Sequence, residues 1–278
     1  MINEVLQWAE KEKPVRAVIL VGSRAQNKHD ALSDYDLQLF CDNIDALTRN
    51  DAWLSKIGKI WVCVHEKVRH HGKDFPSRLV IFDKGVKIDF AFYPVEALKE
   101  IASAPSLVAE YNRGYKVLLD KDQLTTTMPA PNPKFRHEVK PNQQEFLTVV
   151  NEFWFEAYHV AVYLKRGDLW SAHFRLSGLH HQFLLKMIEW NELSKIDWKD
   201  SLPAFGKRMQ LWVSPKTRDA LHRSFAHFDE EVSWNALKNI MALFRHLSCE
   251  TAQLIGYSYP RDVDDNISDF INQLGSRS

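Results

Sequence analysis

The sequence has few cysteines and no long apolar run, and each absence excludes a class of protein. Three cysteines, Cys41, Cys63 and Cys249, are scattered among 278 residues. They form no Cys-x-x-Cys pair and their odd number cannot pair fully, so we expect reduced thiols rather than a disulfide framework. No uncharged stretch approaches the roughly 18 apolar residues of a membrane helix, and the first residues lack the apolar core of a signal peptide. These features predict a cytoplasmic protein with no membrane partner.

The charge balance shows no excess of either sign. Lysine and arginine contribute 36 residues, as many as the 36 aspartates and glutamates, and there is no basic tail. Because proteins that bind nucleic acids commonly use a basic excess or patch to contact phosphates, we expect no nucleic acid partner. The 45% of hydrophobic residues is enough for a packed core and for more than one domain.

The first half of the chain mixes short apolar runs with helix-forming segments. The helix-forming composition of residues 3–12 predicts a helix there, and Pro14 ends it. Apolar runs predict strands at 16–21, 37–41, 57–64, 78–82 and 86–92. A hairpin at Lys84-Gly85 is expected to join the last two strands, and further helices are expected at 44–55 and 95–111. Since strands and helices do not alternate strictly, this half predicts a mixed-sheet unit.

The second half has the pattern of a helical bundle. A proline-rich stretch at about 129–142 has no periodicity and is typical of a linker; it contains Pro129, Pro131, Pro133 and Pro141. Beyond it, periodic apolar residues predict helices at about 143–165, 169–191, 233–256 and 264–274. The sequence therefore predicts an α+β protein, with a mixed-sheet domain at residues 1–135 and an all-α helical bundle domain at 136–278.

Three acidic residues fall at strand positions of the first half. Asp34 and Asp36 are two residues apart, so in an extended segment both side chains point to one face. Asp89 lies between Ile88 and Phe90, in a strand that is otherwise apolar, where an unpaired charge is costly to bury. Three convergent carboxylates without basic partners would repel one another, and a divalent cation resolves that repulsion. We therefore expect Asp34, Asp36 and Asp89 to hold Mg²⁺, which prefers oxygen ligands.

Gly22 and Ser23 end the first predicted strand, ahead of the aspartate pair. Glycine at a strand end lets the backbone approach a phosphate closely, the Ser23 hydroxyl can hydrogen-bond to that phosphate, and Arg24 adds a charge. Alone, Gly-Ser or Asp-x-Asp is an ordinary turn or loop sequence. Together and in this order, a phosphate-binding turn and a carboxylate cluster indicate phosphoryl or nucleotidyl transfer.

The same residues carry a family resemblance. Gly-Ser, followed after ten residues by Asp-Tyr-Asp-Leu, resembles the signature of the DNA polymerase β-like nucleotidyltransferase superfamily. More narrowly, the chain is similar to the aminoglycoside 6-adenylyltransferase (streptomycin adenylyltransferase) family. The matching segments are Gly22-Ser23-Arg24, Ser33–Asp36, Val86–Asp89, Tyr115–Asp122, Asn151–Trp154 and Gly256–Pro260. The first of these specify the superfamily, and Asn-Glu-Phe-Trp and Tyr-Ser-Tyr-Pro point to the narrower family.

The resemblance implies an activity and roles for the N-terminal residues. It implies a Mg²⁺-dependent enzyme that transfers AMP from ATP to a hydroxyl of an aminoglycoside such as streptomycin, releasing pyrophosphate. Asp34 and Asp36 would bridge the metals and hold the triphosphate, and Asp89 would hold the metal nearest the attacking oxygen. Ser23, assisted by Arg24, would bind a terminal phosphate. The first domain would then be the nucleotidyltransferase domain and the second the acceptor-binding domain of a monomer.

The acceptor site is expected to be acidic, because an aminoglycoside is a polycation. In the helix at 143–165 a narrow stripe contains Glu145, Glu152, Glu156, His159 and Tyr163. An ordinary solvated helix face is the alternative, but the resemblance at Glu152 favours a catalytic role there, as acceptor ligand or general base. The family pattern has an acidic residue near the start of the next helix. This chain instead has His173 there and no acid, which leaves Asp89, Glu152 and His173 as candidate bases.

Two other functions are compatible with the sequence. One is a nucleotidyltransferase with a different acceptor, such as another small molecule, a protein or an RNA end. The other is a relative without activity that acts as a binding module. The intact set of Asp34, Asp36 and Asp89 favours an enzyme, because a binding module has no need of three convergent acids.

Overall fold

The computed structural model describes residues 1–70, 72–132 and 139–276. The chain divides into two compact units, Met1–Phe135 and Arg136–Ser278. The domain boundary and Pro133 of the expected linker lie within residues 133–138, outside the described residues. The flanking residues 129–132 and 139–142 contain neither helix nor strand, as expected of a linker. Every helix in the described part of the chain is too short or too polar to span a bilayer.

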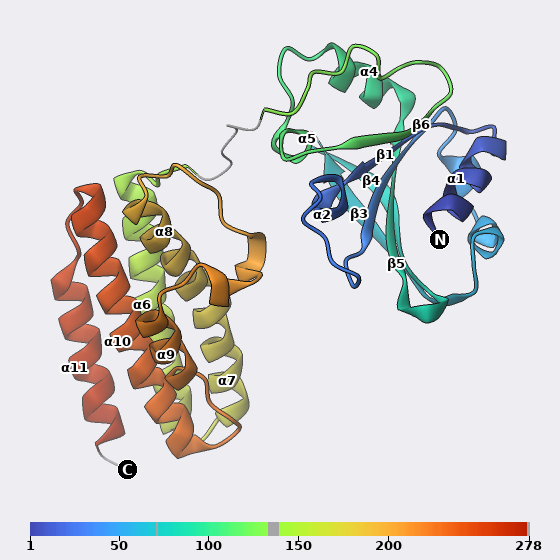
Figure 1. The fold of residues 1–278 in the computed structure, drawn as a ribbon. Coiled ribbons are helices and arrows are strands. Elements are labelled where there is room, and N and C mark those ends of the chain that lie inside the picture. Colours follow the sequence, from blue (N-terminus) through green and yellow to red (C-terminus); the bar gives the residue numbers. More distant parts are fainter. Residues whose placement is uncertain (71, 133–138, 277–278) are drawn as a thin grey trace. The chain divides into compact units, whose positions relative to one another are not determined.

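The first unit contains a six-stranded mixed sheet with the strand order β3-β4-β5-β2-β1-β6 (Figure 1). The strands are β1 (Val15–Val21), β2 (Tyr35–Cys41), β3 (Ile60–His70), β4 (Lys73–Phe82), β5 (Lys87–Pro94) and β6 (Lys116–Asp120). The central pair β2 and β5 is parallel, and the other four neighbouring pairs are antiparallel. The predicted mixed sheet and α+β class are confirmed.

Three strands differ clearly from the sequence prediction. β4 begins at Lys73 rather than at Arg78, because its first residues pair with the equally unpredicted outer half of β3. The other two, β3 and β6, lie at the edges of the sheet. β3 continues to His70 although we expected it to end at Val64, because its outer half is charged and exposed and therefore lacks an apolar signal. β6 was not predicted at all, since its five residues become a strand only by pairing with β1. The hairpin between β4 and β5 is confirmed, and Lys84 and Gly85 in its turn both have positive φ, 62° and 74°.

Different helices cover the two faces of the sheet. On one face, α1 (Ile2–Lys11) and the 3₁₀ helix η1 (Ala52–Lys56) pack against alternate strand residues, and Trp8 stacks on Trp53 at 4.3 Å. On the other face, α4 (Val95–Ser103) and α5 (Ala109–Asn112) pack against the opposite set. The expected helix at 44–55 is interrupted into α3 (Asp45–Thr48) and η1, and the one at 95–111 into α4 and α5. The short helix α2 (Gly22–Ala25) follows β1 directly.

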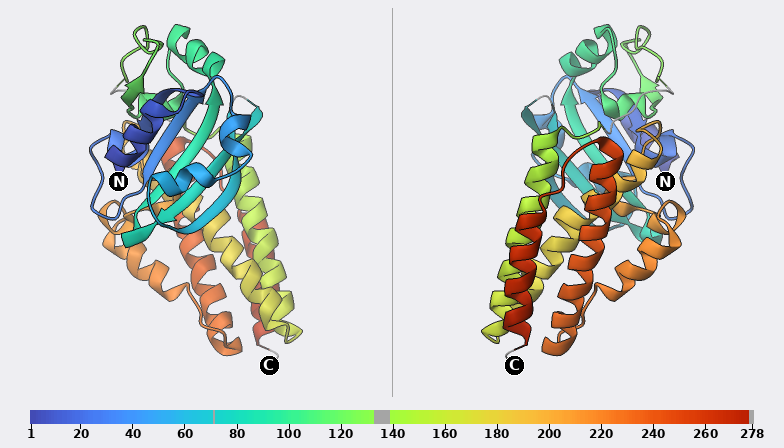
Figure 2. Two further views of the ribbon diagram at one scale, coloured as in Figure 1. Left: turned by 90° about the vertical axis from the view of Figure 1, so that its right-hand side faces the viewer. Right: turned by 90° about the vertical axis from the view of Figure 1, so that its left-hand side faces the viewer.

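The second unit is an all-α bundle, as predicted. Its helices are α6 (Gln143–Lys165), α7 (Leu169–Gly178), α8 (Leu185–Lys195), α9 (Pro215–Arg223), α10 (Glu230–Ile255) and α11 (Arg261–Gly275). The long helices α6, α10 and α11 lie side by side (Figure 2), and Phe153 stacks on Phe244 at 3.6 Å in their core. The expected helix at 169–191 is α7 and α8 joined without a break by a π-helical segment, Leu179–Leu184. The helix α9 was not expected; Ser214 caps it and Pro215 starts it.

A buried polar network joins three helices of the bundle. The Trp154 indole donates to the Tyr259 hydroxyl at 3.0 Å, and Tyr259 donates to the Asp264 carboxylate at 2.8 Å. Asp264 is 2% exposed and forms an ion pair with Arg245 of α10. Two segments that carry the narrow resemblance, Asn151–Trp154 and Gly256–Pro260, therefore meet in a structural contact.

Candidate functional site

The register of three strands places the site residues in one row across the sheet. Asp36 of β2 lies opposite Asp89 of the parallel strand β5, and on its other side opposite Val21 of β1. Gly22 follows Val21 directly, at the start of α2. Pairing between strands thus brings together residues that are more than 50 positions apart in the sequence.

The three expected carboxylates converge. Asp34, Asp36 and Asp89 each present an oxygen, and these oxygens all lie within 4.8 Å of one another. All three side chains are half-buried. The structure therefore groups three hard oxygen donors of the kind that Mg²⁺ prefers.

Gly22 is in contact with this cluster. Its φ is +71°, and a Cβ atom at this position would lie 1.9 Å from Oδ2 of Asp36. A side chain here would both strain the backbone and displace the carboxylate. Glycine therefore allows the end of β1 to approach Asp36.

Lys87 is a basic partner that our sequence analysis missed. Its Nζ lies 2.9 Å from Asp34 Oδ2 and 2.7 Å from Asp89 Oδ2, so one ammonium group bridges two of the three acids. The expectation of carboxylates without basic partners was therefore wrong. The signal was present in the sequence, because Lys87 is two residues before Asp89 in the same strand and must share its face.

The acids keep raised pKa values despite this lysine. Burial, followed by the charges of Asp34 and Asp89, raises the pKa of Asp36 to about 6, against an effect of Lys87 in the opposite direction. Burial likewise raises the pKa of Asp89, although Lys87 opposes it. Both shifts mean that the ionised cluster is electrostatically unfavourable without a further cation.

The residues fit a divalent cation on two further grounds. Oδ1 of Asp89 is buried, and no group among the described residues hydrogen-bonds to it. A buried carboxylate oxygen without a partner is costly unless a cation or a proton contacts it. Since every donor is an oxygen, the cluster is suited to a hard cation such as Mg²⁺ rather than to a softer metal.

A second layer of polar groups lies next to the acids and was also missed. Gln38 is two residues beyond Asp36 on the same strand face and is 3% exposed. Tyr111 of α5 donates to its amide oxygen. Gln38 also hydrogen-bonds to Glu110, whose pKa is raised by burial and whose charge adds to the raised pKa of Asp36. A glutamine inside the apolar run of β2 was the available signal.

The two other residues expected at the phosphate have different environments. Ser23 is half-buried in α2, beside Gly22. The guanidinium of Arg24 instead donates to the backbone carbonyls of Ser33 and Asp34 at 2.6–3.0 Å and lies 3.9 Å from the ring of Tyr35. Arg24 thus holds the segment that carries Asp34.

The glutamates in the acidic stripe of α6 have different surroundings. Glu145 completes a capping box with Asn142, and Glu156 forms an ion pair with Arg175 at 2.7 Å. Glu152 is exposed on the same helix. His173 of α7 is hydrogen-bonded to Ser233 at 3.0 Å, a contact that joins α7 to α10.

Comparison with known proteins decides the family. A family model described as "Streptomycin adenylyltransferase" matches residues 1–274. The chain belongs to the streptomycin adenylyltransferase family. An aminoglycoside 6-adenylyltransferase of Campylobacter jejuni is 30% identical over 96% of this chain and 92% of its own length. Another, from Bacillus subtilis strain 168, is 28% identical over 97% of this chain and 95% of its own length. This family member is therefore an enzyme, a nucleotidyltransferase.

The crystal structure of an aminoglycoside 6-adenyltransferase from Bacillus subtilis matches with 24% sequence identity and a TM-score of 0.48, covering 99% of this chain and 97% of that chain.

Proposed function

We propose that this streptomycin adenylyltransferase family member transfers AMP from ATP to a hydroxyl group of an aminoglycoside, with streptomycin as the acceptor and Mg²⁺ as the cofactor. The observation that carries the proposal is the convergence of Asp34, Asp36 and Asp89 beside Gly22. The relatives from C. jejuni and B. subtilis, both named aminoglycoside 6-adenylyltransferases, support this acceptor class.

The reaction requires one bond to form and one to break at the α-phosphorus. The acceptor oxygen attacks that phosphorus, the bond to the bridging oxygen of the β-phosphate breaks, and its electron pair leaves with pyrophosphate. The acceptor hydroxyl loses its proton in the same process. Bound Mg²⁺ would neutralise charge on the phosphates and on the leaving group.

The carboxylates have distinct parts in this proposal. Asp34, Asp36 and Asp89 would hold the cation, and Asp89 would accept the hydroxyl proton, because its Oδ1 has no hydrogen-bond partner among the described residues and its pKa is raised. Lys87 would neutralise part of the cluster before the substrate binds, since it already contacts two of the acids.

The residues next to the cluster position the triphosphate. Gly22 would let the backbone approach it, and the Ser23 hydroxyl would hydrogen-bond to a phosphate. We assign Arg24 to positioning, because its guanidinium is committed to the carbonyls of Ser33 and Asp34.

We assign the acceptor to the helical unit, with Glu152 as a ligand for its ammonium groups. Glu152 is exposed, whereas Glu145 and Glu156 of the same stripe have structural partners. His173 is a weaker candidate for a base, since Ser233 already occupies its Nε2.

A test of the proposed reaction is an acceptor panel read by mass spectrometry. The full-length protein would be incubated with ATP, Mg²⁺ and, separately, streptomycin, other aminoglycosides and an RNA with a free 3′ end. We expect streptomycin to gain the mass of one AMP with release of one pyrophosphate, and chelation of Mg²⁺ to prevent both. Transfer only to other aminoglycosides would overturn the streptomycin assignment, and transfer to RNA alone would overturn the acceptor class.

A further inference from the structure

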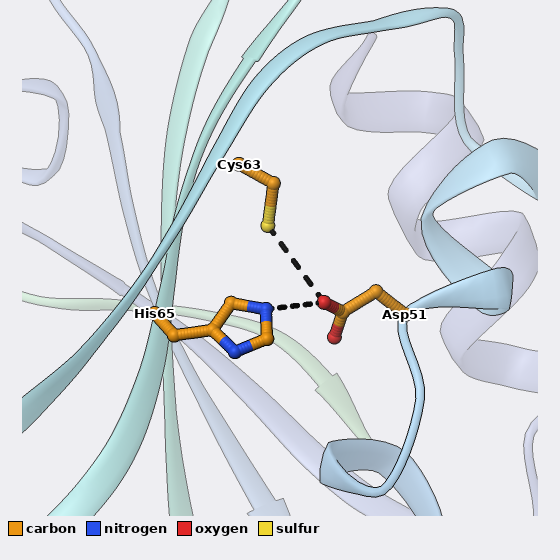
Figure 3. A group of neighbouring side chains, drawn as sticks. All are labelled: Asp51, Cys63 and His65. Carbon is orange, nitrogen blue, oxygen red and sulfur yellow. Dashed lines mark hydrogen bonds and ion pairs between the residues drawn. The ribbon is translucent and has the colours of Figure 1, made fainter.

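A second group of metal-ligand side chains lies on the edge strand β3. Cys63 and His65 are two residues apart and so share a face of this strand. Asp51, the residue before η1, approaches them from a different segment of the chain. Figure 3 shows the three side chains pointing toward one another, and one ligand atom from each lies within 4.8 Å of the others.

This group is separate from the carboxylate cluster. In the sheet register Cys63 pairs with Val80, which pairs with Ile88, so Cys63 shares its face with Ile88. Asp89, the next residue, points to the opposite face. The two groups therefore lie on opposite faces of the sheet and also differ in chemistry: one is all oxygen, and the other has sulfur, nitrogen and oxygen.

We propose that Asp51, Cys63 and His65 form a site for a zinc-class transition-metal ion, distinct from the Mg²⁺ site. Thiolate and imidazole donors select such ions over Mg²⁺, and three protein ligands with one open position are a common zinc arrangement. The His65 side chain is 59% exposed, so water can supply the fourth ligand.

The distances between the donor atoms suit this ion after small side-chain movements. His65 Nε2 lies 2.5 Å from Asp51 Oδ2, and Cys63 Sγ lies 4.0 Å from the same oxygen. Tetrahedral zinc with ordinary bond lengths separates its ligand atoms by roughly 3.3–3.6 Å. The first distance must therefore open and the second must close, each by less than about 1 Å.

Arg78 supports the proposed ligand geometry. Its Nε donates to Asp51 Oδ1 at 2.7 Å, which leaves Oδ2 directed at the histidine and the thiol. The rest of the guanidinium is held by the backbone carbonyls of Thr48 and Ser77. An outer group that fixes a carboxylate ligand in this way is a regular part of zinc sites. The ion would tie the segment before η1 to the edge of the sheet.

Cobalt binding to the full-length protein tests the proposal, because Co²⁺ replaces Zn²⁺ and reports a thiolate ligand by a near-ultraviolet charge-transfer band. We expect chelator-treated protein to develop this band, saturating at one Co²⁺ per chain, and Zn²⁺ but not excess Mg²⁺ to remove it. Absence of the band in the unmodified protein would overturn the proposal, and so would its removal by Mg²⁺.

Matched variants locate the ligands. Cys63→Ser should abolish the band, whereas Cys249→Ser, on α10 of the other unit, should retain it. Since even an outer-shell partner contributes roughly 10–100-fold to metal affinity, His65→Gln should weaken Co²⁺ binding at least about tenfold. Circular dichroism of each metal-free variant confirms that it folds. A band that persists in folded Cys63→Ser, or one lost in folded Cys249→Ser, contradicts the site.

Discussion

At the scale of single residues, Gly22 and Asp36 constrain each other. The carboxylate occupies the space where a side chain at position 22 would lie, and the glycine backbone has a conformation that other residues avoid. Gly85 is a natural comparison, because its φ of +74° is close to the +71° of Gly22 but nothing lies within 4 Å of its missing Cβ. Comparing substitutions at Gly22 and Gly85 therefore distinguishes the effect of backbone strain from the effect of contact with Asp36.

Replacing either glycine with alanine should give different results for stability and activity. Gly22→Ala and Gly85→Ala should each cost about 1–2 kcal/mol in the free energy of unfolding, because alanine is strained at positive φ. Only Gly22→Ala should also lose most of its AMP transfer, since its Cβ displaces Asp36. Denaturant unfolding and a pyrophosphate-release assay measure the two effects. Full activity in folded Gly22→Ala would contradict the assigned contact.

The raised pKa of Asp36 predicts a pH dependence of Mg²⁺ binding. Without metal, Asp36 is protonated in the folded protein below about pH 6, whereas in the unfolded chain it ionises near 3.8. Between these values the folded state binds more protons, so this group's contribution to stability is largest at low pH and is lost as the pH rises through about 6. Because Mg²⁺ needs the ionised carboxylate, its affinity should fall about tenfold for each unit below that pKa.

Calorimetric titration of Mg²⁺ at several pH values checks this dependence. In Lys87→Met the decline should begin at higher pH, since Lys87 lowers the pKa of both Asp36 and Asp89. A pH-independent Mg²⁺ affinity in the unmodified protein would be inconsistent with cation binding by Asp36.

At the scale of elements, the bundle depends on the network that joins Trp154, Tyr259, Asp264 and Arg245. Tyr259 is central to it, since its hydroxyl accepts from Trp154 and donates to Asp264. Two of the segments that identify the family are thus explained by packing of α6 against the start of α11. Similarity in these segments reports on the fold of the bundle as much as on its chemistry.

Removing the Tyr259 hydroxyl should destabilise the bundle without changing the chemistry. We expect Tyr259→Phe to cost about 1–3 kcal/mol, because the buried Trp154 indole and Asp264 each lose a hydrogen bond. Tyr158→Phe is the control, since the Tyr158 ring contacts His159 and Phe270 through its aromatic face and edge, and phenylalanine keeps that ring. Thermal unfolding of both variants should show a lowered midpoint only for Tyr259→Phe, with AMP transfer by the folded protein retained in each. Equal midpoints would show that the network contributes little.

Sequence patterns predicted the elements with strong local signals and missed those that depend on distant partners. Apolar periodicity located α6 to within a residue at each end, and the hairpin followed from Lys84-Gly85. β6 was missed because only its pairing with β1 makes five residues a strand. In the site, Asp36 and Asp89 were predictable because acids are unusual in apolar strands, and Asp34, just before β2, because it is two residues from Asp36. Lys87 was missed although its place two residues before Asp89 put both side chains on one face, and only its contact with Asp34 depends on pairing across the sheet.

At the scale of the whole molecule, the balanced charge means that attraction of a polycationic acceptor must be local. With 36 basic and 36 acidic residues there is no net charge to attract it. Glu152 is our candidate for a local contact. Glu152→Gln should raise the KM for streptomycin about threefold to tenfold, as for an ion pair of roughly 1 kcal/mol at an exposed site, with little change in kcat.

Steady-state kinetics at two salt concentrations tests this role. The increase in KM should shrink at high salt, because screening weakens the same interaction in the unmodified protein. Glu231→Gln, at another exposed glutamate of the helical unit, should leave KM unchanged. A large loss of kcat in Glu152→Gln would instead make Glu152 the general base.

The central claim is that the cluster of Asp34, Asp36 and Asp89 performs nucleotidyl transfer, and one comparison tests it most directly. AMP transfer would be measured by mass spectrometry for the unmodified protein, for Asp36→Asn and for Asp42→Asn, an exposed aspartate just beyond β2. The predicted results are a loss of AMP transfer of more than about 100-fold in Asp36→Asn and full activity in Asp42→Asn. The loss should be this large because outer-shell partners of a metal ligand already contribute roughly 10–100-fold to activity, and a direct ligand contributes more. Retained transfer in a folded Asp36→Asn protein would contradict the account.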